Sequence, residues 1–194
     1  MADGPARAGR IAEGVPFTDL LRMTVLLAAG EATALAAITV LAAARDDDTT
    51  TLAVAAAWWA AAVAIGFYLG RPARAANGVR EPLAAARTTT SLSPESPERI
   101  ALGRLWPIGV SALLAGGLGI FWPGVAAIAA GYALLVALAW RRREAAVIAI
   151  EERDGVRFYV EPGSALRPLE LVRTPGLGRD RTPPGHPPPP PPAA

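Results

Sequence analysis

Residues 23–44 read MTVLLAAGEATALAAITVLAAA, and this stretch decides the class of the protein. It holds a single charged residue, Glu31, and its apolar residues surround the helix axis instead of forming one stripe. A helix needs about 20 consecutive apolar residues to cross the hydrocarbon core of a bilayer, and one that is apolar on every side has no face suited to water. The stretch therefore predicts a membrane-spanning helix.

Three more apolar blocks follow, at residues 52–70, 105–122 and 125–140. The last block is short, but Arg141 to Arg143 can extend its helix because arginine stems reach the headgroup region. The chain is 52% hydrophobic, whereas a soluble domain of this length would alternate apolar and polar faces. We therefore predict an all-α membrane protein with four transmembrane helices and a short C-terminal cytoplasmic β-hairpin.

The distribution of arginine predicts the orientation. Of the 19 arginines, 18 fall on one side of the predicted helices, and Arg45, followed by three aspartates, is the exception. Short loops rich in arginine stay in the cytoplasm, so we expect both termini on the cytoplasmic side of the inner membrane. The basic surplus then faces anionic lipid, which makes the bilayer an expected partner and nucleic acid an unexpected one. Arginine without lysine, beside abundant alanine, is also typical of GC-rich bacterial genomes.

The four blocks and their links give the predicted organisation of the chain. In order, it comprises a cytoplasmic tail (1–18), a first transmembrane helix (19–45), an outer loop (46–51), a second helix (52–70), a cytoplasmic arginine-rich loop (71–96), a third helix (97–122), an outer turn (123–124), a fourth helix (125–143), a cytoplasmic hairpin region (145–173) and a disordered proline-rich tail (174–194). The arginine-rich loop has no long apolar period, so we expect it to be partly disordered beside the lipid surface.

Proline and glycine mark several ends and bends. Ser96 followed by Pro97 predicts a helix that starts ahead of the third apolar block. Pro107 removes one helix hydrogen bond, which predicts a kink. Pro123 and Gly124 suit the central positions of a type II turn, so we expect a tight helical hairpin there.

The C-terminal region carries a hairpin signal. Asp154-Gly155 separates two β-prone runs, 147–153 and 156–161, and an Asp-Gly pair in that setting strongly indicates a β-hairpin. Residues 169–173 are a candidate third strand. A sheet this small is marginally stable alone, so we expect it to lean on the bilayer or the bundle, or to bind another chain through an open edge.

Glu31 is the most informative break in the apolar pattern. An ionised carboxylate near the bilayer centre costs about 2.5–3.5 kcal/mol. The seven Leu, Ile and Val residues of the first block return about 2–4 kcal/mol, so insertion is close to balanced. We expect Glu31 to face other helices. It is then either a proton, cation or substrate site, or a protonated carboxyl that holds helices together by a hydrogen bond to Thr24, Thr33, Ser111 or a backbone carbonyl.

Small residues recur every four positions in the later blocks, a spacing that lets helix backbones approach closely. Gly66 and Gly70 share one face of the second block, and Ser111, Ala115 and Gly119 share one face of the third. We predict these five as helix-packing residues. The spacing serves a bundle and a homodimer equally well, so both uses stay open.

Residues that carry chemistry are scarce in this sequence. The chain has no cysteine, and its single histidine, His186, lies in the proline-rich tail. Thiolate chemistry is therefore excluded, and His-based metal or catalytic arrangements are not expected. The acidic run Asp46–Asp48 and the carboxylates around the predicted hairpin suit solvated surfaces better than metal or acid–base sites. We expect no catalytic residue, no metal and no cofactor.

Two functions compete on this evidence. The leading hypothesis is a non-enzymatic scaffold, accessory or regulatory subunit, with a homo-oligomer or another membrane protein as its partner. It depends on the small-residue faces, the open sheet edge and the proline-rich tail, which suits an aromatic groove. The alternative is a small transporter or channel subunit that uses Glu31. A membrane enzyme would need polar residues gathered at one membrane depth, a pattern that the sequence lacks.

Overall fold

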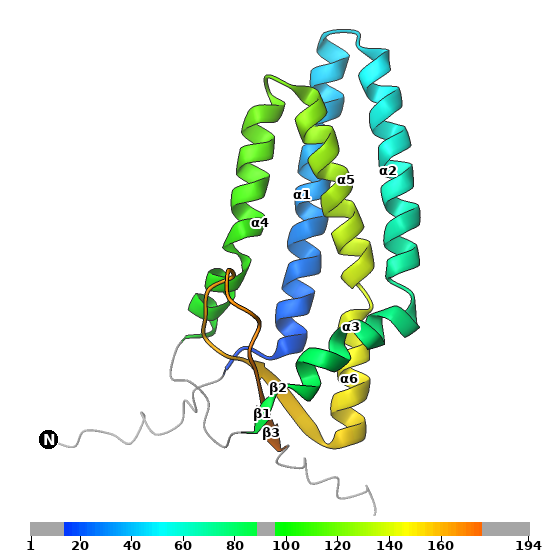
Figure 1. The fold of residues 1–194 in the computed structure, drawn as a ribbon. Helices are drawn as coiled ribbons and strands as arrows, with labels where there is room; N and C mark the ends of the chain where they lie inside the picture. The colour runs from blue at the N-terminus through cyan, green and yellow to red at the C-terminus, as the bar shows by residue number, and fades with distance from the viewer. Residues whose placement is uncertain (1–13, 89–95, 176–194) are drawn as a thin grey trace, which may run out of the picture.

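The computed structural model describes residues 14–88 and 96–175, and this part of the chain is mostly helical (Figure 1). Its elements are, in order, α1 (Phe17–Arg45), α2 (Thr49–Leu69), α3 (Pro72–Ala84), β1 (Arg87–Thr88), α4 (Pro97–Gly119), α5 (Pro123–Trp140), α6 (Arg143–Asp154), β2 (Val156–Val160) and β3 (Leu171–Pro175). Most of the predicted N-terminal tail and of the proline-rich tail, with His186, lies outside the described residues.

Within residues 14–88 and 96–175, four helices are long and apolar enough to cross a membrane: α1, α2, α4, and α5 with its continuation α6. Each contains most of the apolar block from which it was predicted, and the ends of α1, α2, α4 and α5 differ from the predicted ones by at most three residues. α1 begins directly after Pro16. α2 begins at Thr49 because the Asp48 side chain accepts the N–H of Thr51 at 3.0 Å and so caps the first turn.

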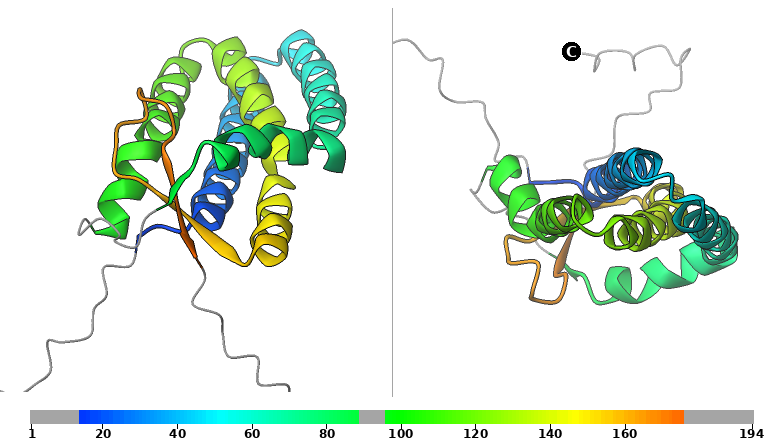
Figure 2. Two further views of the ribbon diagram at one scale, coloured as in Figure 1. Left: turned by 60° about the horizontal axis from the view of Figure 1, so that its bottom comes forward. Right: turned by 90° about the horizontal axis from the view of Figure 1, so that it is seen from above.

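The four long helices run side by side, with α1 and α5 at the centre (Figures 1 and 2). α5 packs against α1, α2 and α4, whereas α1 and α2 make few contacts with each other despite the short link between them. Leu35, Ala115, Ala126 and Ala130 form a small buried cluster where α1, α4 and α5 meet. The fourth long helix therefore joins the other three into one bundle.

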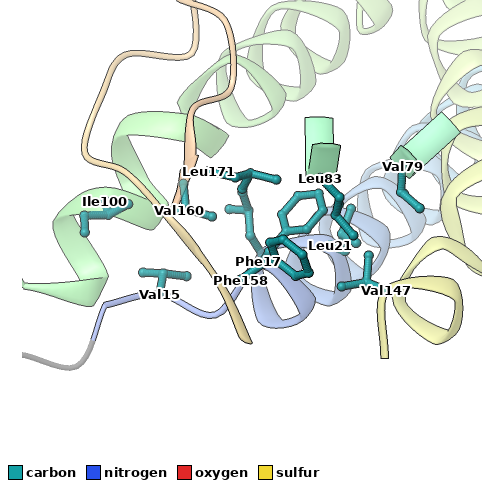
Figure 3. Close-up of a cluster of buried hydrophobic side chains, with 11 residues drawn as sticks. Val15, Phe17, Leu21, Val79, Leu83, Ile100, Val147, Phe158, Val160 and Leu171 are labelled. Atoms are coloured by element: carbon teal, nitrogen blue, oxygen red, sulfur yellow. The ribbon is translucent and has the colours of Figure 1, made fainter. Parts of the chain in front are cut away.

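The largest buried core lies at one end of this bundle, and we call that end the cap. The cap consists of residues 14–16, the first turns of α1 and α4, helices α3 and α6, and the three strands. Its buried side chains are drawn in Figure 3: Val15, Phe17, Leu20, Leu21, Val79, Leu83, Ile100, Val147, Phe158, Val160 and Leu171. Figure 1 shows that both ends of the described chain lie here, and that the links from α1 to α2 and from α4 to α5 lie at the opposite end.

The strands form a three-stranded sheet in the order β1–β3–β2. β2 and β3, at or near the second and third predicted strands, are antiparallel with Phe158 opposite Arg173, and β1 pairs in parallel with β3. The outer edge of β2 is not free, because the N–H of Val160 donates to the carbonyl of Val15 at 2.9 Å. On the β2 side, the expected open edge is therefore covered by the chain's own residues 15 and 16.

α6 occupies the region predicted as the first hairpin strand, so that hairpin is wrong. Val147 and Ile150 both contact the cap core, and a separation of three residues puts them on one side of a helix but on opposite sides of a strand. Gly155 adopts the left-handed conformation, with φ 64°, and donates its N–H to the carbonyl of Glu151. Asp154-Gly155 therefore ends a helix, which is the other common use of a glycine that tolerates positive φ.

The arginine-rich loop expected to be partly disordered contains a helix instead. α3 buries Ala75, Val79 and Leu83, which are spaced by four residues and so form one apolar stripe. That stripe packs against α6, and β1 follows. The stripe consists of only three apolar residues and lies among arginines. It is therefore too short to be recognised from the sequence without its packing partner. Residues 89–95 of the predicted loop lie outside the described part.

The turn between α4 and α5 is formed by residues 120–122 instead of the expected outer turn at 123–124. Pro123 is the first residue of α5, a position where the N–H that proline lacks has no helical acceptor. Gly124 does not have the positive φ that the second central position of a type II turn requires. The Pro-Gly pair thus starts the helix.

The presence of Pro107 in α4 allows this helix to form a hydrogen bond with the connection between β2 and β3. As a proline inside α4, it leaves the carbonyl of Gly103 without its helical donor. The N–H of Ala165, in that connection, donates to this carbonyl at 3.0 Å. The guanidinium of the adjacent Arg104 donates to the carbonyl of Ser164 at 3.1 Å. In Figure 1 the first turns of α4 are set at an angle to the rest of the helix, beside this connection.

Candidate functional site at Glu31

Glu31 lies midway along α1, where that helix passes α4. Its Oε1 lies 3.1 Å from the Oγ of Ser111, and the same hydroxyl lies 2.9 Å from the carbonyl oxygen of Ile108. A hydroxyl has one hydrogen, so Ser111 cannot donate fully to both oxygens. Both contacts are hydrogen bonds at once if Glu31 is protonated, because its O–H then donates to Ser111 while Ser111 donates to Ile108.

The Glu31–Ser111 pair lies at the outer seam between α1 and α4 instead of the bundle interior. Glu31 is only partly buried and Ser111 is exposed. Close by on α1, Leu27 is 47% exposed, and a Cβ added to Gly30 would meet no atom within 4 Å. The sequence predicts that Glu31 faces other helices, and the structure shows it facing only the edge of α4.

Two other side chains offered by the sequence as partners for Glu31 bond elsewhere. Thr24 donates to the carbonyl of Leu20 at 2.8 Å, and Thr33 donates to the carbonyl of Ala29 at 2.9 Å. Both are bonds to the preceding turn of the same helix, which satisfy a hydroxyl in an apolar setting. Ser111 is therefore the one side-chain hydrogen-bond partner of Glu31 among the described residues.

Gly66 and Gly70 lie where α2 approaches α5. A Cβ on Gly66 would lie 2.8 Å from the Cβ of Leu138 and 3.2 Å from the carbonyl oxygen of Leu135, and a Cβ on Gly70 would meet the backbone of Leu138. These distances are shorter than ordinary carbon contacts, so the two backbones can approach this closely only with glycine. Both glycines therefore serve the packing of two helices of the same chain.

The small residues of α4 lie toward α1 and α5. Ala115 is 9% exposed, and a Cβ on Gly119 would lie 2.6 Å from the Cβ of Ala126. Ser111 occupies the same stripe but reaches the outer seam, where it meets Glu31. Of the five predicted packing residues, Ser111 alone is thus open to a helix from outside.

Trp58 and Trp59, whose depth in the second apolar block suits packing between helices or contact with lipid, contact α5. Their indole N–H groups donate to the backbone of α5, Trp58 to the carbonyl of Ile128 at 3.2 Å and Trp59 to that of Ala127 at 2.9 Å. Gly131 makes room for this contact, since a Cβ there would collide with the Trp58 indole. The adjacent tryptophans within an apolar block were a signal, because a buried indole N–H needs an acceptor.

The acidic residues outside the bundle form no candidate metal centre in the described ranges, where no group of three or more His, Cys, Asp or Glu side chains is close enough to hold an ion. Of the run Asp46–Asp48, Asp48 bonds the N–H and hydroxyl of Thr51 at the start of α2. Glu151, near the predicted hairpin, accepts the N–H of Phe158 at 2.9 Å and so joins α6 to β2. Asp48 and Glu151 therefore have structural contacts of their own.

Comparison of the chain with protein-family models, with curated proteins and with solved structures finds no match. What the site can do thus follows from its own atoms. A carboxyl with one hydroxyl partner can exchange a proton or bond a further polar group across a helix interface. Among the described residues, Glu31 is the one carboxyl within the four apolar blocks, and its pair with Ser111 is reachable from outside the bundle.

Proposed function

We propose that this protein is a multi-pass inner-membrane protein with both termini in the cytoplasm. In this proposal it acts as a non-enzymatic scaffold, accessory or regulatory subunit by binding a transmembrane helix of a partner protein at the Glu31–Ser111 seam. The partner helix would offer a polar side chain to the carboxyl and cover the exposed apolar residues beside it. The cap would then face water on the cytoplasmic side.

The arginine distribution supports the orientation. Of the 15 arginines within the described ranges, Arg45 alone lies at the end opposite the cap. Short arginine-rich segments are retained in the cytoplasm during insertion, so the cap end is the cytoplasmic end. The large buried core of the cap also suits water, in which burial of large apolar side chains is favourable.

The single observation that carries the proposed role is the position of Glu31. A carboxyl at mid-membrane is expensive wherever it lies, and it normally faces a bundle interior or a water-filled cavity. Here it lies at the outer seam of the bundle, with Ser111 as its one side-chain partner in the described structure. A helix from another chain would remove this exposure, whereas Gly66, Gly70 and Gly119 already pack against helices of this chain.

Site-directed crosslinking tests the proposal, and the absence of native cysteine simplifies it. Leu27→Cys places a thiol beside Glu31, and Val54→Cys places one on the exposed face of α2 as a matched control. A photoreactive thiol reagent is attached in native membranes, and the adducts are identified by mass spectrometry. We expect a defined adduct at Leu27→Cys that falls roughly threefold with Glu31→Leu, since one interhelical hydrogen bond contributes about 0.6 kcal/mol.

The controls separate the outcomes. An adduct that is the same with Glu31→Leu, or that forms equally at Val54→Cys, contradicts recognition through the carboxyl. An adduct made of two copies of this chain identifies the partner as a homo-oligomer. No adduct at Leu27→Cys, in membranes where the protein is extracted folded, rules the partner-binding role out.

The transporter alternative is favoured by one feature, the protonatable Glu31–Ser111 chain of hydrogen bonds. If the protein carries protons or cations, reconstituted liposomes will show a flux that Glu31→Gln abolishes and Ser111→Ala reduces. The amide of Gln keeps the hydrogen bond but cannot release a proton at neutral pH. A flux that is absent from the wild-type protein removes this alternative and leaves the partner-binding role untouched.

A further inference from the structure

A hollow of about 380 Å³ opens at the cap end between α2, α3 and the junction of α5 with α6. Arg74 and Asn77 of α3 and Arg143 of α6 supply its polar wall, and Leu69, Leu135 and Trp140 supply most of its apolar wall. The apolar wall belongs to α2 and α5, two of the helices long enough to cross a membrane. The hollow thus has one charged side and one side continuous with the spanning surface.

The guanidinium groups at this hollow are held by aromatic rings. The guanidinium carbon of Arg143 lies 4.2 Å from the centre of the Trp140 ring, and that of Arg74 lies 4.4 Å from the centre of the Tyr68 ring. Arg74 also donates to the hydroxyl of Tyr68 at 3.0 Å. A guanidinium stacked on a ring keeps hydrogen-bond donors at its edge free for an anion.

More positive charge lies beside the hollow, and no carboxylate of the described residues forms an ion pair with it. Arg71 lies 4.7 Å from the Tyr68 ring centre, and Arg141 lies 4.4 Å from that of Phe67. The single ion pair among residues 14–88 and 96–175 joins Arg153 to Asp154, at the far end of α6. The arginines around the hollow therefore gather charge without an acidic partner in the described structure, an arrangement that suits a phosphate.

We propose that this hollow binds the phosphate headgroup of an anionic phospholipid. The arginines match the phosphate, and the wall of Leu69, Leu135 and Trp140 matches the glycerol and the first carbons of an acyl chain. A free phosphate would leave that apolar wall without a ligand, so lipid is the occupant that uses both sides. Basic pockets between spanning helices at the cytoplasmic surface hold such headgroups. The inference depends on the proposed membrane insertion but not on the partner-binding role of Glu31.

Electron spin resonance of spin-labelled lipids tests this assignment on the full chain in phosphatidylcholine vesicles. The measurement is the association of labelled phosphatidylglycerol relative to labelled phosphatidylcholine. We expect Arg74→Gln and Arg143→Gln each to lower this preference about fivefold, since loss of one direct hydrogen bond to the phosphate, about 1 kcal/mol, corresponds to that factor. Arg80→Gln is the matched control, because Arg80 is exposed on the same helix but does not line the hollow. It should change the preference less than twofold.

Two additional arms make the outcome decisive. Arg143→Lys keeps the charge and should retain most of the preference, which separates loss of binding from loss of folding. Excess inorganic phosphate should not displace the labelled lipid. Equal losses in the Arg80 and Arg74 variants would show that the preference is general attraction to the charged surface. Displacement by phosphate would show that the hollow binds a soluble anion and not lipid. Either result overturns the proposal. Protein that does not enter the vesicles would contradict membrane insertion itself, a separate failure seen by flotation.

Discussion

The bundle and the cap of this molecule are packed with different residues. The buried apolar side chains of the bundle are mainly alanines, with Leu35 the largest that is fully buried. The cap buries Phe17, Phe158 and several Leu and Val side chains. Helices in lipid gain nothing by transferring large apolar groups from one apolar medium to another, so they associate through small residues and close backbone approach. Where water is the solvent, burying large side chains is the main source of stability.

This difference predicts that the two regions respond to opposite changes. Truncating a large side chain should matter most in the cap, and enlarging a small one should matter most in the bundle. Substitutions at Phe158, Gly131, Trp59 and Asp48 test the two regions, in order of decreasing expected effect.

Phe158→Ala should have the largest effect, because Phe158 is 2% exposed in the cap core. Removing a buried phenyl ring lowers the free energy of unfolding by about 3–5 kcal/mol. We expect the cap to lose protection while the bundle stays helical, so limited proteolysis should cut within residues 141–175 and leave a fragment that holds α1, α2, α4 and α5. Arg157→Ala, on the exposed side of the same strand, is the control. Equal sensitivity of the two variants would show that the cap is not held by this core.

Gly131→Ala tests the bundle from the other direction. The added methyl group would overlap the Trp58 indole, and overpacking of this kind costs about 1–3 kcal/mol. Gly117→Ala is the matched control, because a Cβ there meets no atom within 4 Å and should be tolerated. Thermal unfolding in detergent checks the pair of variants. A Gly131→Ala protein as stable as the Gly117→Ala protein would contradict the close approach of α2 and α5.

Trp59→Phe should have a smaller effect within the same contact. It keeps an aromatic ring but removes the indole N–H that donates to the carbonyl of Ala127 at 2.9 Å. Interhelical hydrogen bonds in bundles contribute about 0.6 kcal/mol on average, so the loss should be close to that value. Combining Trp59→Phe with Gly131→Ala in a double-mutant cycle checks whether the two residues act together. Additive effects would show that the hydrogen bond is independent of the ring packing.

Asp48 supplies the smallest expected effect, at the end of the bundle opposite the cap. Hydrogen bonds from the Thr51 hydroxyl and then its backbone N–H hold the pKa of Asp48 below its usual value. A lowered folded-state pKa contributes stability above the unfolded pKa of about 3.9, and this contribution is lost as pH falls through the lower folded value. Asp48→Asn keeps a capping oxygen without a titrating group. The wild-type protein should therefore lose more thermal stability than Asp48→Asn between pH 6 and about pH 3. Identical losses would remove Asp48 as the cause.

The predictability of the fold follows the same division. The long helices are recognisable because each apolar block stands by itself and needs no partner to be identified. The cap is different, because α3 is stabilised by contacts of Val79 and Leu83 with elements distant in sequence. Its helical period is short and interrupted by Pro82, so local residues do not reveal it. The hairpin predicted at Asp154-Gly155 was wrong for a related reason. A left-handed glycine ends a helix as readily as it turns a hairpin, and tertiary packing decides between the two.

The candidate site was predictable in part. Glu31 is visible as a charge in an apolar block, and the spacing of Gly66 and Gly70 indicates close packing. Sequence offered three hydroxyl groups as partners for Glu31, and choosing Ser111 requires the positions of two helices relative to each other. The exposure of the pair could not be deduced either, because it depends on α5 inserting beside α1 and leaving α4 at the periphery. The sequence shows that arginines are concentrated on one side of the predicted helices, but it does not show that some of them gather around a hollow. Their arrangement is set by contacts with aromatic residues of α2 and α5.

The hydrogen bond between Ala165 and the carbonyl that Pro107 leaves free has a mechanical consequence. Rotation of the start of α4 about its own axis would carry the Gly103 carbonyl away from Ala165. The helix can therefore rotate only if this hydrogen bond breaks or if the β2–β3 connection moves with the helix. Because Arg104 grips the same connection, the two attachments resist such rotation together. A torque applied to α4 by a neighbouring helix would therefore reach the sheet as a pull on β2 and β3. The proline that removes one hydrogen bond from α4 thus provides an attachment of this helix to the sheet of the cap.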